Sequence, residues 1–244
     1  MKVVSFNLHL GGKKGDGNAW QHLIRDFAPD IVCAQESADP HSYPIDTGAI
    51  PEDRRVWKCA PDRNNWGSAI VAMSHKHEEI EVDGFLGWVA GARLPDVEIG
   101  GTSGPLTIFS IHAPSPGPYT AQVDKILDAI AAKWDKGPLI IAGDFNVTTA
   151  KRSPTEPYPN SKQELALLAR LREEFGLRNA WQALHPGQEL PQTLRWNNRP
   201  DVPYHCDGIF VDARHLPHLV SAEVVASGYW GSASDHNSIV VEFR

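Results

Sequence analysis

The sequence predicts an α/β fold in which strands and helices are mixed along the whole chain. Apolar runs of strand length, such as IVCA and LIIA, recur from one end of the chain to the other. Between them lie segments with apolar residues at helical spacing, of which residues 161–176 give the strongest pattern. A third observation is that several apolar runs end in Asp, Asn, Glu or His. Asp and Asn are poor strand residues, so their place at strand ends indicates a turn or a reaction site.

Strands are expected where apolar or alternating residues run for a strand's length between turn residues. In chain order they fall at residues 2–8, 30–36, 68–74, 78–85, 87–94, 105–114, 139–142, 205–211, 219–227 and 237–244. The runs at 30–36 and 139–142 are almost wholly apolar, which is typical of strands buried on both faces. The strands at 78–85 and 87–94 are expected to pair with each other.

Helices are expected where apolar residues recur at helical spacing, at residues 19–28, 120–134 and 161–176. The first helix stops before Pro29, and Thr120 is the expected N-cap of the second. In the third, Ser161 and Glu164 form a capping box, and Gly176 suits the C-terminal cap. Residues 37–65 are rich in Pro, Asp and Asn and are expected to form a long loop.

The composition sets limits on function. The 244 residues carry a formal charge of -7, with 41% hydrophobic and 22% charged residues, so an ordinary globular core is expected. A protein that holds nucleic acid by a broad basic surface would be more positive, although basic residues can cluster locally. The three cysteines form no CxxC or zinc-type spacing and are expected to be reduced thiols. The first ten residues are too short and polar for a signal peptide, and no run approaches a membrane span, so a cytoplasmic location is expected.

Polar residues stand at the ends of, or directly beside, the apolar runs. They are Asn7, Glu36, His112, Asp144, Asn146, Asp207, Asp235 and His236. Any one of them alone is best explained as a turn, a cap or a structural hydrogen bond. Together they place four carboxylates with little basic charge, which is unfavourable through mutual repulsion unless a cation is present. Oxygen donors without cysteine favour Mg²⁺, Mn²⁺ or Ca²⁺ over zinc.

The chain resembles the endonuclease/exonuclease/phosphatase superfamily, which includes DNase I-like nucleases, abasic-site endonucleases, inositol polyphosphate phosphatases and neutral sphingomyelinases. The blocks SFNLH, CAQE, SIHAPS, AGDFN, CDGIFV and SDHNSIVVEF occur in the family's order and span Ser5 to Phe243. The resemblance implies a four-layer α/β sandwich, with two mixed β-sheets packed face to face and helices outside. It also implies a single domain over residues 1–244, so that residues 152–160 are a surface loop rather than a linker.

The resemblance assigns roles to the polar residues. Glu36 matches the principal metal ligand, with Asn7 beside it and Asp235 near the metal, and the implied ion is Mg²⁺ or Mn²⁺. Asp144 matches the residue that orients or deprotonates the attacking water. Asn146 matches an amide that positions the phosphate.

Two histidines complete the implied site. Asp207 and His236 match a carboxylate–histidine dyad. His112 matches the second histidine of the DNase I-like and sphingomyelinase-like branches. Abasic-site endonucleases tend to have a tyrosine there, which argues against that branch. No Ser/His/Asp or Cys/His arrangement offers a covalent nucleophile, so direct attack by water is expected.

Substrate-binding roles are expected for four residues that flank these motifs, namely His9, Arg195, Trp196 and His205. His9 stands where some relatives carry Asp or Arg, which leaves the number of metal ions open. His205 precedes CDGIF and would either contact phosphate or pack. Aromatic residues near the site would stack on bases or pack in the core, and arginines would bind further phosphates or face solvent.

Three functions are compatible with the sequence. The first is a metal-dependent nuclease or phosphodiesterase acting on nucleic acid, which the SIHAPS block favours. The second is a hydrolase of a small phosphate ester or lipid head group, which the acidic charge favours. A non-catalytic binding module is the third, although every catalytic position is filled. The protein is expected to act as a monomer.

Overall fold

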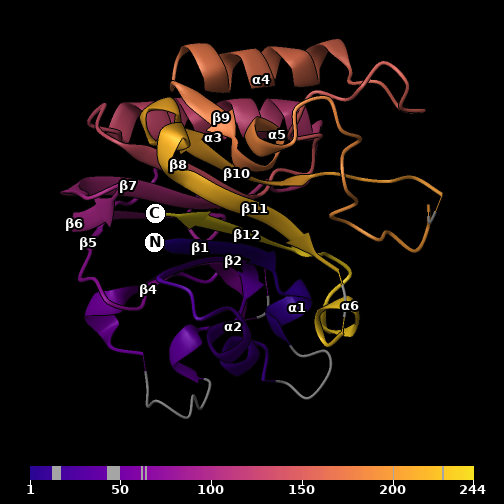
Figure 1. Cartoon of the computed structure of the whole chain (residues 1–244). Helices are drawn as coiled ribbons and strands as arrows, with labels where there is room; N and C mark the ends of the chain where they lie inside the picture. The colour runs from indigo at the N-terminus through magenta and orange to yellow at the C-terminus, as the bar shows by residue number, and fades with distance from the viewer. Residues whose placement is uncertain (13–17, 43–49, 62, 64, 200, 227) are drawn as a thin grey trace.

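The computed structural model describes residues 1–12, 18–42, 50–61, 63, 65–199, 201–226 and 228–244. Two six-stranded sheets pack face to face, with helices on their outer sides. In Figure 1, α3 (Tyr119–Lys133) and α4 (Lys162–Glu173) lie above one sheet, and α2 (Ala19–Phe27) lies below the other. The four-layer α/β sandwich expected from the resemblance is confirmed.

The first sheet runs in the order β11 (Leu219–Val225), β12 (Ser238–Phe243), β1 (Lys2–Asn7), β2 (Ile31–Ser37), β4 (Gly67–Ala72), β3 (Arg55–Trp57). The second sheet runs in the order β5 (Glu78–Glu79), β6 (Val89–Ile99), β7 (Thr102–His112), β8 (Leu139–Asp144), β10 (Asp207–Asp212), β9 (Leu177–Asn179). The pairs β1–β2 and β7–β8 are parallel. The carboxyl ends of these four strands carry site residues, and His112 is the register partner of Asp144.

Three apolar clusters hold the layers together. The cluster between the sheets takes Val3 and Ile31 from the first sheet and Ile140 from the second. The cluster under α3 and α4 includes Ile141, the next residue of β8. A third cluster packs α2 against the first sheet. Because successive residues of a strand face opposite sides, β8 is buried on both faces, which explains its wholly apolar sequence. Since the central cluster joins both sheets, we propose that residues 1–244 form one domain.

The N-terminal signal of α4 is confirmed, whereas its C-cap is Glu174 rather than the expected Gly176. The capping box of α4 is present, with the Ser161 hydroxyl accepting from the Glu164 backbone N–H and the Glu164 carboxylate accepting from that of Ser161. The helix expected at residues 120–134 is α3, which begins at Tyr119. Its N-cap is therefore Pro118, and the prediction of Thr120 as the N-cap was wrong. The shorter elements are α1 (His9–Gly12), α5 (Ala180–Leu184), α6 (Trp230–Ala233), and the 3₁₀ helices η1 (Pro40–Ser42), η2 (Glu52–Arg54) and η3 (Ala213–His218).

One strand expectation and one loop expectation need correction. Residues 78–85 form a strand only at Glu78–Glu79, because the chain then turns at Gly84, whose φ is +79°. The expected loop at 37–65 contains β3 as well as η1 and η2, and its residues 43–49, 62 and 64 lie outside the described part. Short elements of this kind carry too few residues for a periodic signal.

The loop at 152–160 is fixed to the body of the protein, as a surface loop rather than a linker would be. The Arg152 guanidinium donates to the Glu156 carboxylate at 2.9 Å, and both side chains are only 4% exposed. Arg152 also donates to the carbonyl of Pro203, and Glu156 accepts from the backbone N–H of Leu190. These contacts tie the loop to the segment that leads into β10.

Gly143 allows β8 to lie close to β7 directly before the site. Its φ is +141°, and a Cβ added there would come within 2.0 Å of the Ile111 carbonyl oxygen. Only glycine avoids that clash, so the residue type at 143 fixes where Asp144 emerges.

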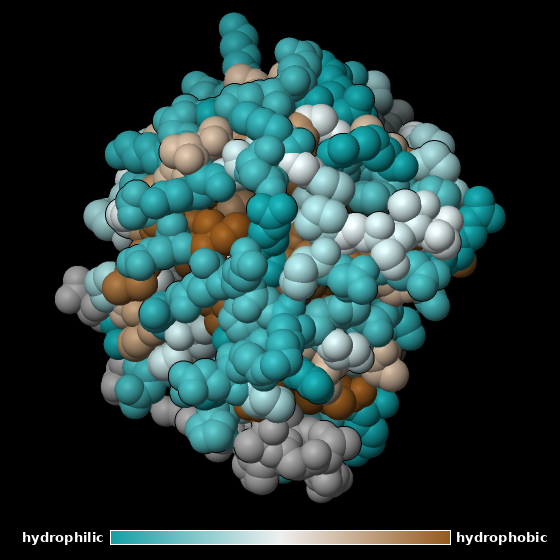
Figure 2. All heavy atoms as spheres, turned by 90° about the vertical axis from the view of Figure 1, so that its left-hand side faces the viewer, coloured by the Kyte–Doolittle hydropathy of each residue, from teal (hydrophilic) through white to brown (hydrophobic). Residues whose placement is uncertain are grey.

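The surface that faces the viewer in Figure 2 is largely hydrophilic, and apolar atoms gather there only in small patches. Among the described residues, none of the helices combines the length and the apolar character needed to cross a membrane.

Candidate active site

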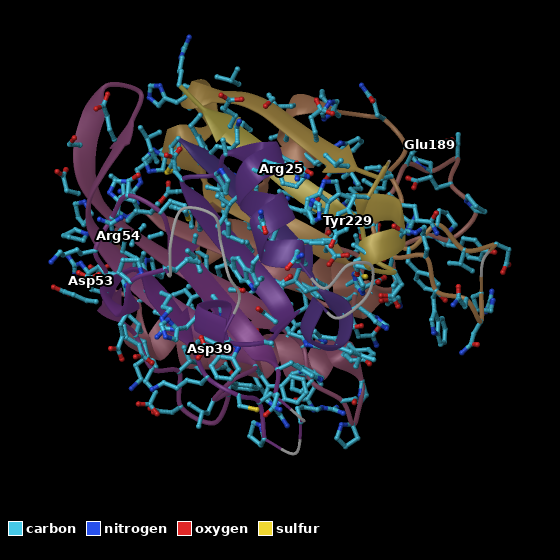
Figure 3. The ribbon with its side chains drawn as sticks, turned by 90° about the horizontal axis from the view of Figure 1, so that it is seen from below. Arg25, Asp39, Asp53, Arg54, Glu189 and Tyr229 are labelled. Atoms are coloured by element: carbon cyan, nitrogen blue, oxygen red, sulfur yellow. The ribbon has the colours of Figure 1, made fainter. Side chains whose placement is uncertain are left out.

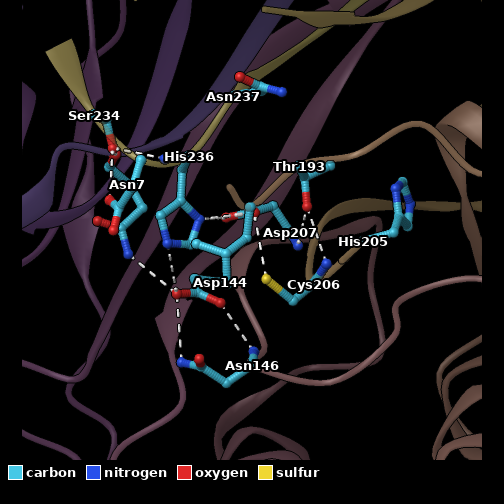
Figure 4. A network of polar contacts seen from close by, with 12 residues as sticks. Asn7, Asp144, Asn146, Thr193, His205, Cys206, Asp207, Ser234, His236 and Asn237 are labelled. Atoms are coloured by element: carbon cyan, nitrogen blue, oxygen red, sulfur yellow. Dashed lines mark hydrogen bonds and ion pairs between the residues drawn. The ribbon is translucent and has the colours of Figure 1, made fainter. Parts of the chain in front are cut away.

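Asp144 is the centre of a buried polar cluster at the carboxyl ends of the central strands (Figure 4). The Asn7 amide donates to its Oδ2 at 3.1 Å, and the Asn146 backbone N–H donates to its Oδ1 at 2.9 Å. The Nε2 atoms of His112 and His236 each lie 3.8 Å from Oδ2. Burial, and then the charge of Asp207, raise the pKa of Asp144, and the two histidines oppose that rise.

Asp207 and His236 form the expected dyad. His236 Nδ1 lies 2.9 Å and 3.1 Å from the two Asp207 oxygens, which leaves Nε2 directed toward Asp144. Burial acts to lower the pKa of His236, but the Asp207 and Asp144 carboxylates outweigh it and raise the pKa to about 10. His236 is therefore an imidazolium at neutral pH. The Thr149 hydroxyl donates to the backbone carbonyl of Asp207 and so helps to hold this residue in place.

Glu36 presents one carboxylate oxygen to the cluster. Its Oε2 accepts from the backbone N–H of Leu10 at 2.8 Å. Its Oε1 lies 3.4 Å from the Asn7 amide nitrogen and 3.9 Å from His112 Nε2. The Asn7 oxygen is already engaged by the backbone N–H of His9, so Asn7 turns its NH₂ group toward the carboxylates. This arrangement makes Asn7 an orienting residue and does not support its expected role as a metal ligand.

The backbone around the cluster is strained. All four residues of α1, His9–Gly12, have positive φ values, so this element is a left-handed turn. Glu36 and Asn146 have φ values of 47° and 53°. Each non-glycine residue in this region costs about 1–2 kcal/mol, and such strain gathers at functional sites. The turn is held by a 2.6 Å contact between His9 Nδ1 and Asp235 Oδ1.

The side chains of two tryptophans enclose His112. The rings of Trp66 and Trp88 lie 5.6 Å and 5.4 Å from the imidazole. Burial is the main cause that lowers the pKa of His112. The Arg63 guanidinium lies 5.3 Å and 5.2 Å from the centroids of the same two tryptophan rings. None of the sequence motifs includes Arg63, Trp66 or Trp88.

Three of the flanking residues differ in how far they can reach a substrate. Arg195 donates to the carbonyls of Ser234 and His236, so it holds the loop that carries the dyad histidine and does not face a substrate. Trp196 is 44% exposed and packs edge-on against Tyr204, so it remains free to contact a ligand. His9 is engaged with Asp235 at the left-handed turn.

His205 is not placed to bind phosphate. Its side chain is 1% exposed, and Nδ1 lies 2.7 Å from the Pro191 carbonyl oxygen. Figure 4 shows it turned away from His236. The cause is a bend before β10, where the Thr193 hydroxyl accepts from the backbone N–H groups of both Cys206 and Asp207. In a flat strand those two groups would point to opposite sides.

We expect His205 to make the protein sensitive to acid. Burial lowers its pKa from 6.5 to about 4. Between pH 6.5 and 4, His205 therefore binds a proton in the unfolded chain but not in the folded protein. The free energy of unfolding is unaffected by His205 above pH 6.5 and decreases as pH falls below it. The loss approaches about 3 kcal/mol at pH 4. His205→Asn keeps a donor for Pro191 and is expected to flatten the fall in Tm between pH 6.5 and 4. The exposed control His41→Asn should fall as steeply as the wild type, and an equally steep fall in His205→Asn would contradict the assignment.

Cys206 is a neighbour of the site, standing directly before β10 rather than inside it. Its Sγ lies 3.7 Å from Asp207 Oδ2, and the donor atoms of Asp144, Cys206 and His236 lie within 4.8 Å of one another. Sulfur and imidazole donors suit zinc. Burial, however, raises the pKa of the thiol well above its ordinary value, and His236 is already an imidazolium. The oxygen of Glu36 therefore fits a hard divalent cation better than this trio fits zinc.

Two aromatic residues near the site pack in the fold. Trp230 contacts Phe6 and Phe27, and Tyr229 stacks on His22 with 3.8 Å between ring centroids. Figure 3 places Tyr229 beside α6. These contacts favour packing over base stacking at both positions.

Residues 4–236 match the model of the endonuclease/exonuclease/phosphatase family. No curated protein matched the chain. An AP endonuclease from Archaeoglobus fulgidus has a similar structure, with a TM-score of 0.70 and 15% identity over 100% of this chain and 99% of that one.

Two further structures are similar. The APE2 catalytic domain from Xenopus laevis gives a TM-score of 0.72 and 16% identity over 100% of this chain and 91% of that one. The 3′ phosphatase NExo from Neisseria, bound to product DNA hairpin, gives a TM-score of 0.70 and 15% identity over 100% of this chain and 99% of that one. At such identities the likeness shows the fold and does not decide between branches of the family.

Proposed function

This chain belongs to the endonuclease/exonuclease/phosphatase family, and from that premise we propose that it is a divalent-metal-dependent phosphodiesterase that cleaves nucleic acid by direct attack of water. The observation that carries the proposal is the environment of Asp144. A 1% exposed carboxylate stands between two histidine Nε2 atoms, each 3.8 Å away. Such an arrangement has a base and two phosphate-facing groups within reach of one phosphorus centre.

Asp144 is the proposed general base. Its raised pKa brings it closer to neutrality, where a base accepts a proton from water most effectively. The Asn146 side chain, 3.4 Å from Asp144 Oδ2, lies where it can hold a phosphate oxygen beside that base. Hydrogen bonds from Asn7 and Asn146 hold the Asp144 carboxylate in place before substrate arrives, which reduces the reorganisation needed in the transition state.

The two histidines have different charge states. His236, an imidazolium held by Asp207, binds a non-bridging phosphate oxygen and supplies a proton to the leaving group. His112, whose pKa is lowered by burial, binds the phosphate as a neutral hydrogen-bond donor. Glu36 and Asp235 are the proposed ligands of Mg²⁺ or Mn²⁺, which when bound would supply Lewis-acid stabilisation of phosphate charge.

Metal dependence gives a direct prediction. EDTA is expected to stop turnover, and Mg²⁺ or Mn²⁺ to restore it. Glu36→Gln should weaken Mn²⁺ binding, measured by calorimetry without substrate, by about tenfold or more because a charged ligand is lost. The exposed control Glu98→Gln should bind as the wild type does. Equal Mn²⁺ affinity in both variants, or full turnover in EDTA, would exclude this metal site.

The second candidate is a hydrolase of a small phosphate ester or lipid head group, which the charge of -7 favours. A substrate panel separates the two. It holds supercoiled plasmid, single-stranded DNA, RNA, bis-p-nitrophenyl phosphate, p-nitrophenyl phosphate and a choline phospholipid, with Asp144→Asn as the blank. Cleavage of a polynucleotide supports the nuclease. Turnover of p-nitrophenyl phosphate or the phospholipid alone supports the second candidate.

A further inference from the structure

We propose that Arg63 binds a phosphate adjacent to the one that is cleaved, so that the preferred substrate is a polynucleotide strand rather than an ester with a single phosphate. The inference rests on the proposed phosphodiesterase function and goes beyond it, because it names the residue that selects the substrate. Arg63 belongs to none of the motifs that suggested the active site.

Arg63 lies one aromatic layer away from the reaction centre. Its guanidinium is 5.3 Å from the Trp66 ring centroid and 5.2 Å from that of Trp88. Both rings pack against His112, whose Nε2 is 3.8 Å from Asp144 Oδ2. The arginine is therefore fixed beside the cluster without entering it. A cation held outside the cluster is placed to contact a neighbouring phosphate rather than the reacting one.

The charge of Arg63 has no partner among the described residues. Its side chain is exposed, and in the part of the chain that the structure describes it forms no ion pair and no side-chain hydrogen bond. By contrast, the buried Arg152 and the partly exposed Arg170 are both paired with carboxylates. In a protein with a net charge of -7, a cation beside the site that no described residue pairs with is available to an anion. A guanidinium held by aromatic rings keeps its N–H donors free for phosphate oxygens.

The two tryptophans are poor platforms for a base. Trp66 is only 7% exposed, and both rings already contact His112 and Arg63. Cation–π contact instead restricts the arginine side chain and reduces the entropy lost when it binds. The aromatic residues thus position a cation, and the cation contacts the substrate.

Tyr119 marks the same rim of the site. It is the first residue of α3 and is 36% exposed. Burial and then the Asp144 charge raise the pKa of its phenol, and the Arg63 charge opposes that rise. Tyr119 therefore lies within electrostatic reach of both the catalytic carboxylate and Arg63.

The test compares one substrate with flanking phosphates and one without. The assay measures how fast the wild type and Arg63→Gln hydrolyse two substrates, a labelled single-stranded DNA oligonucleotide and bis-p-nitrophenyl phosphate. We expect KM for the oligonucleotide to rise about tenfold more than KM for bis-p-nitrophenyl phosphate, because one charge-assisted contact is lost. The slope of log KM against log salt for the oligonucleotide should become shallower by about 0.7, the value for one phosphate contact on a single strand.

Two further variants make the result specific. Arg63→Lys keeps the charge and should retain the salt slope of the wild type. The exposed control Arg172→Gln on α4 should leave KM unchanged for both substrates. Equal changes for both substrates in Arg63→Gln, or an unchanged oligonucleotide KM, would overturn the proposal. A wild type that hydrolyses neither substrate would instead reject the phosphodiesterase function itself.

Discussion

Replacing Asp144 with Asn is expected to lower kcat for bis-p-nitrophenyl phosphate by about 1,000-fold or more, within the range for loss of a general base. The amide cannot accept the proton of water. It also places an NH₂ group among donors, because Asn7 and the Asn146 backbone N–H already donate to this side chain. The loss should therefore appear in kcat, with KM changed less.

The same substitution is expected to leave the protein folded. Burial raises the pKa of Asp144, so its ionised form destabilises the metal-free protein at neutral pH. A neutral amide of the same shape removes that penalty, which offsets the cost of its misplaced NH₂ group and of the lost charge beside His236, so Tm should change little. The exposed control Asp96→Asn should change neither kcat nor Tm. Near wild-type kcat in Asp144→Asn would remove Asp144 from the mechanism.

Replacing His236 with Ala is expected to abolish most turnover, by about 100- to 10,000-fold, because the cation that faces the phosphate is lost. The structure adds a cost in stability that the sequence did not suggest. Asp207 is 2% exposed, and removing its partner leaves a buried charge unpaired, which costs about 3–5 kcal/mol.

A second variant separates chemistry from stability. His236→Asn keeps an N–H donor near the position of Nδ1, so Tm should fall less than in the alanine variant. It lacks the atom that faces Asp144, so turnover should remain as low as in His236→Ala. A variant of either type that retains wild-type kcat would show that the dyad does not take part in the reaction.

The central polar cluster could be predicted because its residues interrupt strongly apolar strands. Asp144 and His112 each end a run that reads as buried, and parallel pairing of β7 with β8 brings their ends together. Asp207 joins them because it is the antiparallel partner of Asp144. Recognising these strands and the family motifs in the sequence was sufficient to predict that the three residues lie close together.

The rim of the site could not be predicted in the same way. Arg63 stands in a segment without periodicity, and its position depends on Trp66 and Trp88, which lie in separate parts of the chain. His205 and Arg195 were expected to bind substrate because they are close to site motifs in sequence. A backbone bend turns His205 into the core, and the carbonyls of the dyad loop engage Arg195. Proximity in sequence does not determine the direction of a side chain.

The most direct test of the account is cleavage of a labelled single-stranded DNA by wild type and Asp144→Asn in Mg²⁺, with EDTA as the second blank. We predict shorter products with the wild type in Mg²⁺, and intact strand with the variant and in EDTA. Equal cleavage by wild type and variant would contradict the assignment of the site. An intact strand with a wild type that still hydrolyses p-nitrophenyl phosphate would contradict nucleic acid as the substrate.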